Sequence, residues 1–200
     1  MANFKAARLQ GRAVIEIAGA EAADFLQGLV TSDVESLKAG SARNAALLTP
    51  QGKILFEFMI LAKGDGHFLL DCPRETAAEL AKRLTFYRLR AKITIAERPD
   101  DAVIAIWGDG ETAPVANAFA DPRLADLGWR AILPGSEVEA VLAKSGPVDE
   151  AAYHGKRSLR FNLEPGQVGR LSTLAFPVYK TQEYRPVIWA RCLTTRSPWT

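Results

Sequence analysis

The chain contains little that could hold a metal ion or form a covalent framework. Its 200 residues include two cysteines, Cys72 and Cys192, which lie far apart and show no paired spacing. The two histidines, His67 and His154, also stand alone in the sequence. Zinc sites and disulfide frameworks require several such residues at characteristic spacings. The sequence therefore supports neither kind of site and favours a reducing compartment.

Long apolar runs and the common nucleotide or hydrolase motifs are missing as well. No stretch approaches the roughly 18 apolar residues of a membrane-spanning helix. The first residues, MANFKAARLQGRAVIEIAG, carry scattered charges instead of the continuous apolar core of a secretory leader. No phosphate loop, nucleophile elbow or internal repeat is found. We expect a cytoplasmic protein with no membrane partner.

Charge is distributed unevenly along the chain. The net charge is +2, yet residues 151–200 hold eight Lys and Arg against two acidic residues, and contain no Asp. A basic tail can indicate an acidic partner such as nucleic acid. Here the cations are dispersed instead of clustered, so no nucleic-acid partner is expected.

Apolar periodicity predicts strands joined by hairpins, with helices between them. A hairpin is expected at 7–19, a turn with a short helix at 31–37, and at most a short helix at 111–120. Further strands are expected at 42–50, 54–62, 67–72, 91–97, 101–108 and within 121–135, and helices at 20–30, 73–89 and 136–146. This order is typical of the α+β class with mostly antiparallel sheets.

Three regions follow from the same pattern. The charged, proline-broken segment ERPDD predicts a boundary near residue 100. After Gly155 neither the strand nor the helix period persists. We expect an N-terminal lobe at 1–100, a partial second lobe at 101–155, and a divergent basic tail at 156–200.

One carboxylate, Glu57, stands inside the apolar run LLTPQGKILFEFMIL. A buried carboxylate without a partner costs several kcal/mol. Strand alternation places Leu55, Glu57 and Met59 on one face, and the apolar residues Ile54, Phe56, Phe58 and Ile60 on the other, which belongs to the core. Glu57 is therefore either an exposed strand residue or part of the wall of a cleft.

Other polar residues have plain structural interpretations. His67 is most simply an exposed turn residue, and Cys72 a small buried apolar residue. The segment TSDV, residues 31–34, can cap a helix. Arg88 and Arg90 alternate along an expected extended segment and are most simply solvated cations.

Three longer stretches carry a resemblance to a known family: FLQGLVTSDVESLKAGSARNAALLTPQGKILFEF, LAKRLTFYRLRAKITI and ADPRLADLGWRAILP. In order and spacing they resemble the YgfZ family of folate-binding proteins. These proteins are related to GcvT, the aminomethyltransferase (T-protein) of the glycine cleavage system, and to mitochondrial iron–sulfur maturation factors. The resemblance runs from about residue 9 to about residue 157. The motif DPRL…GWR is similar to the bacterial YgfZ-like branch.

The resemblance implies tetrahydrofolate as the cofactor, held in a central cleft, and an acidic residue that follows a glycine turn and faces it. Glu57 falls at that position, although acidic members usually have Asp, which is one methylene shorter. By the same matching, four further residues are expected to line the cleft or position its loops: Thr31, Asp33, Asn44 and Arg90.

The family's hallmark segment, Lys-Gly-Cys-x-x-Gly-Gln-Glu, is absent, and VYKTQEYRP only echoes its letters. We therefore expect the chain to be truncated or out of frame after about residue 155. The resemblance implies a tetrahydrofolate-binding protein that supports iron–sulfur cluster assembly or repair, with iron–sulfur proteins as partners. The alternatives are an aminomethyltransferase that transfers a one-carbon unit to tetrahydrofolate, and a non-functional remnant.

Overall fold

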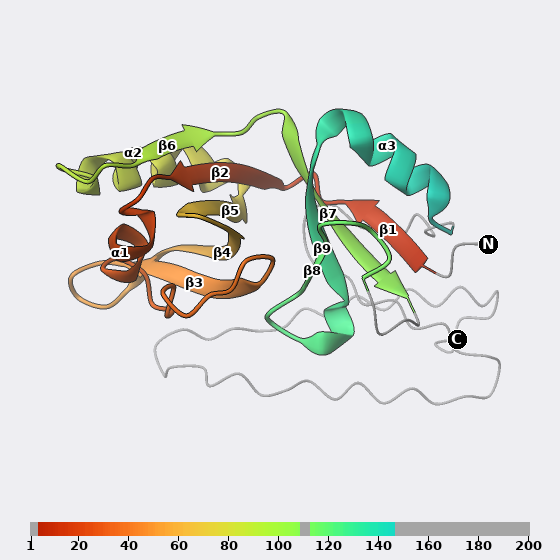
Figure 1. Cartoon of the computed structure of the whole chain (residues 1–200), viewed down its shortest axis with the longest axis horizontal. Coiled ribbons are helices and arrows are strands. Elements are labelled where there is room, and N and C mark those ends of the chain that lie inside the picture. Colours follow the sequence, from red (N-terminus) through yellow and green to blue (C-terminus); the bar gives the residue numbers. More distant parts are fainter. Residues whose placement is uncertain (1–3, 109–112, 147–200) are drawn as a thin grey trace, which may run out of the picture. The chain divides into compact units, whose positions relative to one another are not determined.

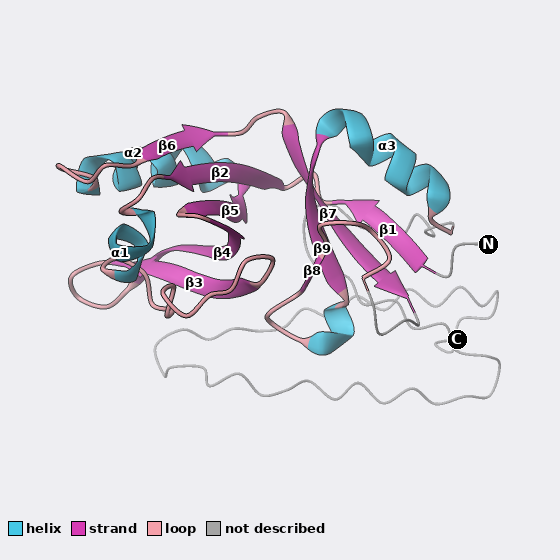
Figure 2. Ribbon diagram, viewed as in Figure 1, coloured by secondary structure: helices cyan, strands magenta, loops and turns pink. Residues whose placement is uncertain are grey.

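The computed structural model describes residues 4–108 and 113–146 (Figure 1). In these residues the α+β class is confirmed, because the named strands form two antiparallel sheets with helices beside them (Figure 2). No described helix combines the length and the apolar character needed to cross a bilayer.

The first sheet has the strand order β3-β4-β5-β2-β6. Its strands are β2 (Arg12–Ala18), β3 (Ala42–Leu48), β4 (Ile54–Gly64), β5 (His67–Pro73) and β6 (Thr94–Glu97). The helices associated with it are α1 (Ala22–Gln27) and α2 (Ala77–Tyr87), the latter preceded by a 3₁₀ turn at Arg74–Thr76. The predicted start of this helix at Pro73 was thus slightly early.

One face of the first sheet forms the main core with α1 and α2. The predicted apolar face of β4 is confirmed for Phe56, Phe58 and Ile60, which are all buried in this cluster. Leu26 of α1 and Leu80 of α2 pack into the same cluster. Burial of such side chains contributes about 1.5–3 kcal/mol each, which makes this cluster a principal source of stability.

The prediction that Ile54 lies in the core was wrong. Its side chain is 67% exposed. The pairing of β3 with β4 shifts at this point: Leu47 lies opposite Phe56, whereas Leu48 lies opposite Ile54. This irregularity skips Leu55 and interrupts the strict alternation on which the prediction rested.

The second sheet has the order β1-β7-β9-β8 and is covered by a third helix. Its elements are β1 (Phe4–Arg8), β7 (Asp101–Gly108), β8 (Phe119–Ala120), β9 (Trp129–Pro134) and α3 (Gly135–Lys144), with a 3₁₀ turn at Ala125–Leu127. Ile104, Leu133 and Val138 are buried in its core.

A third apolar cluster joins the two sheets. It combines residues from the first sheet with Val103 of β7 and Phe119 of β8, and the first-sheet members are Val14, Met59, Leu61 and Leu69. The face of the first sheet that points away from α1 and α2 is therefore packed against the second sheet over part of its area. This packing brings loop residues of the second sheet next to Glu57.

Three local predictions were wrong. Residues 7–19 do not form a hairpin, because β1 pairs with β7 and β2 pairs with β5 and β6. Residues 31–37 form a turn without a helix. The segment around Arg88 and Arg90 is a turn, with Leu89 in the left-handed region at φ 45°, instead of an extended strand.

The division into regions 1–100 and 101–155 stays a prediction. β6 ends at Glu97 in one sheet and β7 begins at Asp101 in the other, but β1 joins the second sheet from the start of the chain. The predicted tail at 156–200, together with His154 and Cys192, lies outside the described residues.

Candidate functional site

Polar residues gather on the face of the first sheet that points away from α1 and α2. Met59 lies opposite Asn44 on β3 and opposite Asp71 on β5. Glu57 is two residues from Met59, and Arg12 is two residues from Val14, the partner of Asp71 on β2. Because side chains alternate along strands and opposite residues share a face, these polar side chains all lie on one side of the sheet.

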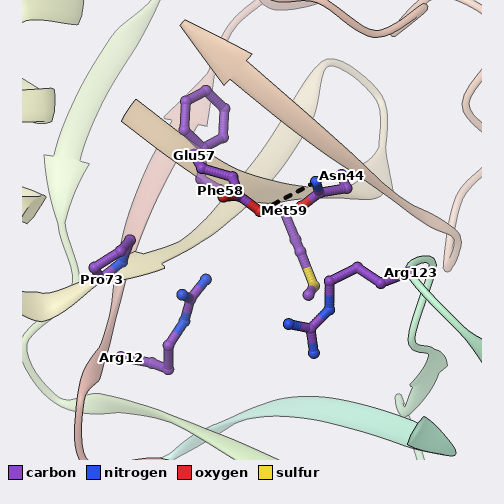
Figure 3. A pocket seen from close by; sticks show the side chains of 7 residues that line it. All are labelled: Arg12, Asn44, Glu57, Phe58, Met59, Pro73 and Arg123. Atoms are coloured by element: carbon purple, nitrogen blue, oxygen red, sulfur yellow. Dashed lines mark hydrogen bonds between the residues drawn. The ribbon is translucent and has the colours of Figure 1, made fainter. Parts of the chain in front are cut away.

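A small pocket of about 160 Å³ opens among these residues (Figure 3). It is lined by Arg12, Asn44, Glu57, Phe58, Met59, Pro73 and Arg123. Arg123 comes from the loop after β8, so both sheets contribute to the pocket. Glu57 is an exposed residue, and its Oε1 accepts a hydrogen bond of 3.4 Å from Nδ2 of Asn44. One wall thus presents a carboxylate and another presents two guanidinium groups.

A chain of ion pairs runs behind the pocket. Asp71 is 1% exposed and accepts hydrogen bonds of 2.5 Å from Nε of Arg12 and 2.5 Å from Nη1 of Arg130. Nη2 of Arg12 also donates to the Asp71 carbonyl oxygen at 2.6 Å. Arg130, on β9, is itself buried. Asp71 therefore links strand β2 of the first sheet to strand β9 of the second.

Asp121 continues this chain toward the other side of the pocket. Its carboxylate accepts a bond of 2.9 Å from Nε of Arg130, and bonds of 2.9 and 2.7 Å from Nε and Nη2 of Arg123. Burial by itself would raise the pKa of Asp121, but the hydrogen bonds from Arg123 and Arg130 outweigh burial and lower the pKa to about 2. The chain of ion pairs therefore begins and ends at the pocket wall: it runs Arg12–Asp71–Arg130–Asp121–Arg123.

The lowered pKa of Asp121 predicts an acid-dependent loss of stability. Since its pKa falls from 3.8 to about 2 on folding, Asp121 stabilises the fold fully above its unfolded pKa. That contribution is lost as the pH drops from about 4 through about 2. Asp121→Asn should therefore be less stable than the wild type at pH 7, and the difference should shrink toward pH 2. Urea unfolding at a series of pH values measures the stability difference between the two proteins. A difference that stays constant from pH 7 to pH 2 would contradict the lowered pKa of Asp121.

The structure brings two of the predicted site residues together and places three elsewhere. Glu57 and Asn44 both line the pocket and contact each other. Thr31, Asp33 and Arg90 are not among its lining residues. The Thr31 hydroxyl accepts a 3.0 Å bond from the Ala46 amide, which fastens the loop after α1 to β3.

Asp33 and Arg90 have different surroundings. The Asp33 carboxylate accepts a hydrogen bond from the Ser36 hydroxyl and lies 3.6 Å from the guanidinium of Arg43. These contacts, with that hydrogen bond as the main cause, lower the pKa of Asp33. Arg90 is exposed in the turn after α2. A ligand-binding role for Thr31, Asp33 and Arg90 stays a prediction.

The ion-pair residues were missed in the sequence. Asp71 lies in the apolar segment HFLLDC, so the argument applied to Glu57, a carboxylate in an apolar run, would have found it. Asp121, Arg123 and Arg130 belong to the motif DPRL…GWR, which was noted but received no role. Arg12 gave no signal, because a cation beside Gly11 resembles an ordinary turn residue.

The structure agrees with the interpretation of Cys72 and differs in part from that of His67. Cys72 is buried, as expected, and burial raises the pKa of its thiol to about 11, so it is a poor nucleophile. His67 begins β5 and is only partly exposed, with Nε2 at 2.6 Å from Oε1 of Glu16. Among the described residues no group of His, Cys, Asp and Glu could hold a metal ion.

Comparisons with known proteins show what this chain is similar to. No protein-family model matches the chain. The mitochondrial iron-sulfur cluster assembly factor IBA57 of Mus musculus is 30% identical over 174 residues, covering 75% of this chain and 48% of that protein. The tRNA-modifying protein YgfZ of Yersinia enterocolitica is 26% identical over 114 residues, covering 57% of this chain and 34% of that protein. The crystal structure of the glycine cleavage system aminomethyltransferase T from Bartonella henselae matches with a TM-score of 0.58 and 18% identity.

In sequence the chain is similar to the IBA57 and YgfZ proteins, and in fold it is similar to the aminomethyltransferase T. The structural match covers 72% of this chain and 45% of the Bartonella protein, and at that identity it shows the fold alone. This YgfZ/GcvT-like chain spans less than half the length of the relatives named here. The predicted family resemblance is confirmed.

Proposed function

We propose that this YgfZ/GcvT-like chain binds tetrahydrofolate and acts in iron–sulfur cluster assembly. The observation that carries the proposal is the pocket, in which the Glu57 carboxylate faces a space shared with Arg12 and Arg123. The second part rests on the similarity to the mouse protein, whose name describes an iron–sulfur cluster assembly factor. Iron–sulfur proteins are therefore the proposed partners.

The residues of the pocket fit the pteridine end of tetrahydrofolate. Its pyrimidine ring is flat, carries N–H donors along one edge, and has apolar faces. Glu57 can accept from the N–H donors, while the Met59 side chain offers apolar contact. The volume of about 160 Å³ is smaller than the roughly 300–1,000 Å³ that encloses a drug-sized ligand. The pocket therefore holds the ring, and the remainder of the folate extends beyond it.

Binding is proposed in preference to turnover. The alternative, transfer of a one-carbon unit to tetrahydrofolate, draws support from a likeness of fold, and fold alone does not establish an activity. Glu57 also differs from the usual Asp by one methylene, which moves the carboxylate along the pocket. The cytoplasmic location stays a prediction; the mouse relative is named as a mitochondrial protein.

Glu57→Gln is expected to weaken tetrahydrofolate binding about tenfold or more. The substitution keeps the size of the side chain but removes the charge that accepts the ligand's N–H donors, and a hydrogen bond to a charged group is worth about 1.5–3 kcal/mol. Isothermal titration calorimetry of the full chain with tetrahydrofolate measures the change. Glu79→Gln, on the exposed side of α2 and outside the pocket, is the matched control.

Two results would contradict the proposal in different ways. Absence of saturable binding by the folded wild-type chain would refute tetrahydrofolate binding itself. Equal affinities of Glu57→Gln and Glu79→Gln would leave folate binding intact but remove Glu57 from the site.

A further inference from the structure

The two walls of the pocket have opposite hydrogen-bonding character. A carboxylate such as Glu57 only accepts hydrogen bonds, whereas the guanidinium groups of Arg12 and Arg123 only donate them. Figure 3 shows the two guanidinium groups on one side of the pocket, and Glu57 with Asn44 on the other. A ligand that fills the space must therefore donate toward Glu57 and accept from the arginines.

Both arginines are held in place by buried carboxylates. Arg12 donates through Nε and Nη2 to Asp71, and Arg123 donates through Nε and Nη2 to Asp121. Among the described residues these bonds leave Nη1 of each guanidinium without a protein acceptor. A guanidinium carries five N–H donors in a rigid plane, so fixing one edge also fixes the direction of the others.

The fixed arrangement makes the arginines selective. A flexible lysine could turn away from an unsuitable group, but a guanidinium that donates two hydrogen bonds to one aspartate residue cannot reorient without breaking them. Arg12 and Arg123 are each only partly exposed, with side chains 23% accessible. A donor group placed against them would leave N–H groups on both sides without acceptors, which is costly in a partly desolvated site.

We propose that Arg12 and Arg123 read the oxygen at position 4 of the pteridine ring, so that the chain prefers 4-oxo over 4-amino pteridines. The inference rests on the proposed tetrahydrofolate binding and names the feature of the ligand that the pocket selects. A 4-oxo pteridine has a carbonyl acceptor beside the N–H at position 3. A 4-amino pteridine replaces that carbonyl with an N–H donor and removes the proton from position 3.

The 4-amino ring therefore loses a contact on both walls. Its amino group faces the guanidinium donors, and its bare ring nitrogen faces the Glu57 carboxylate. Protonation of the 4-amino ring in acid would restore an N–H donor for Glu57. The comparison is consequently made at pH 8, where the ring is neutral.

The experiment measures the dissociation constants of the full chain for tetrahydrofolate and tetrahydroaminopterin, which differ only in the group at position 4 and the proton at position 3. We expect the 4-amino compound to bind about tenfold more weakly or worse, since sites built to hydrogen-bond a group reject analogues that lack it. In Arg12→Met and in Arg123→Met the ratio of the two constants should fall toward one. Asp71 and Asp121 each keep Arg130 as a partner in these variants. Arg83→Met, on α2 and outside the pocket, should keep the wild-type ratio.

The outcomes separate the inference from the proposed function. Equal binding of both compounds by the wild type, or a preference for the 4-amino compound, would overturn the inference while tetrahydrofolate binding stands. A wild-type preference that persists unchanged in both Met variants would overturn the role of the arginines. If neither compound binds, the proposed function fails and the inference fails with it.

Discussion

Asp71→Ala is expected to lower the free energy of unfolding by about 3 kcal/mol or more. Removal of one partner of a buried ion pair typically costs about 3–5 kcal/mol, because the remaining charge stays buried without compensation. Asp71 forms ion pairs with two arginines, and one of them, Arg130, is only 6% exposed. After the substitution Arg130 keeps only Asp121, and Arg12 loses its carboxylate partner.

Urea unfolding at pH 7 measures the loss for Asp71→Ala. Asp33→Ala is the control, since its pair with Arg43 lies in solvent and should matter much less. The double variant Asp71→Ala/Arg130→Met should recover part of the stability, because it removes the buried cation together with its partner. A stability loss for Asp71→Ala no greater than that for Asp33→Ala would show that the ion-pair chain does not join the sheets.

Gly66→Ala is expected to destabilise the fold by about 3 kcal/mol. Gly66 ends the turn between β4 and β5 at φ 70°, where a side chain costs about 1–2 kcal/mol. A Cβ atom there would also lie 2.4 Å from the carbonyl oxygen of Gly19, at the end of β2. The turn and that strand end are already joined, since the Gly19 amide donates to the Gly66 carbonyl at 3.1 Å. The backbone must move to admit the methyl group, which adds about 1–3 kcal/mol.

Gly52→Ala separates the two causes. Gly52 has a similar φ of 79°, but no atom lies within 4 Å of the position its Cβ would take. Only the conformational cost, about 1–2 kcal/mol, should therefore appear. Thermal and urea unfolding of both variants measure the difference. Equal losses at the two positions would contradict the close approach of the turn to β2.

Much of the fold was predictable because its signals are local. The alternation of apolar residues in β4 and the glycine turns around it predicted adjacent antiparallel strands, and β3, β4 and β5 pair in that order. The partner of β1 was not predictable in this way. Local spacing favours a hairpin with β2, but pairing with β7 joins residues about one hundred positions apart. No local pattern encodes that choice.

The residues of the candidate site also divide into those with a local sequence signal and those without one. Glu57 was found from the sequence because a carboxylate within an apolar strand is conspicuous. Arg12 and Arg123 became visible only when the packing of the two sheets placed them at one pocket. Arg90, adjacent to Leu89 in a left-handed turn, is exposed and is not among the residues that line this pocket. Its expected role rested on the family resemblance and stays a prediction.

A crystal structure of the full chain soaked with tetrahydrofolate tests the central claim most directly. The pteridine ring should lie in the pocket, with its N–H edge within hydrogen-bond distance of the Glu57 carboxylate and its 4-oxo group facing Arg12 and Arg123. Ordered tetrahydrofolate at another place, with this pocket filled only by solvent, would contradict the account.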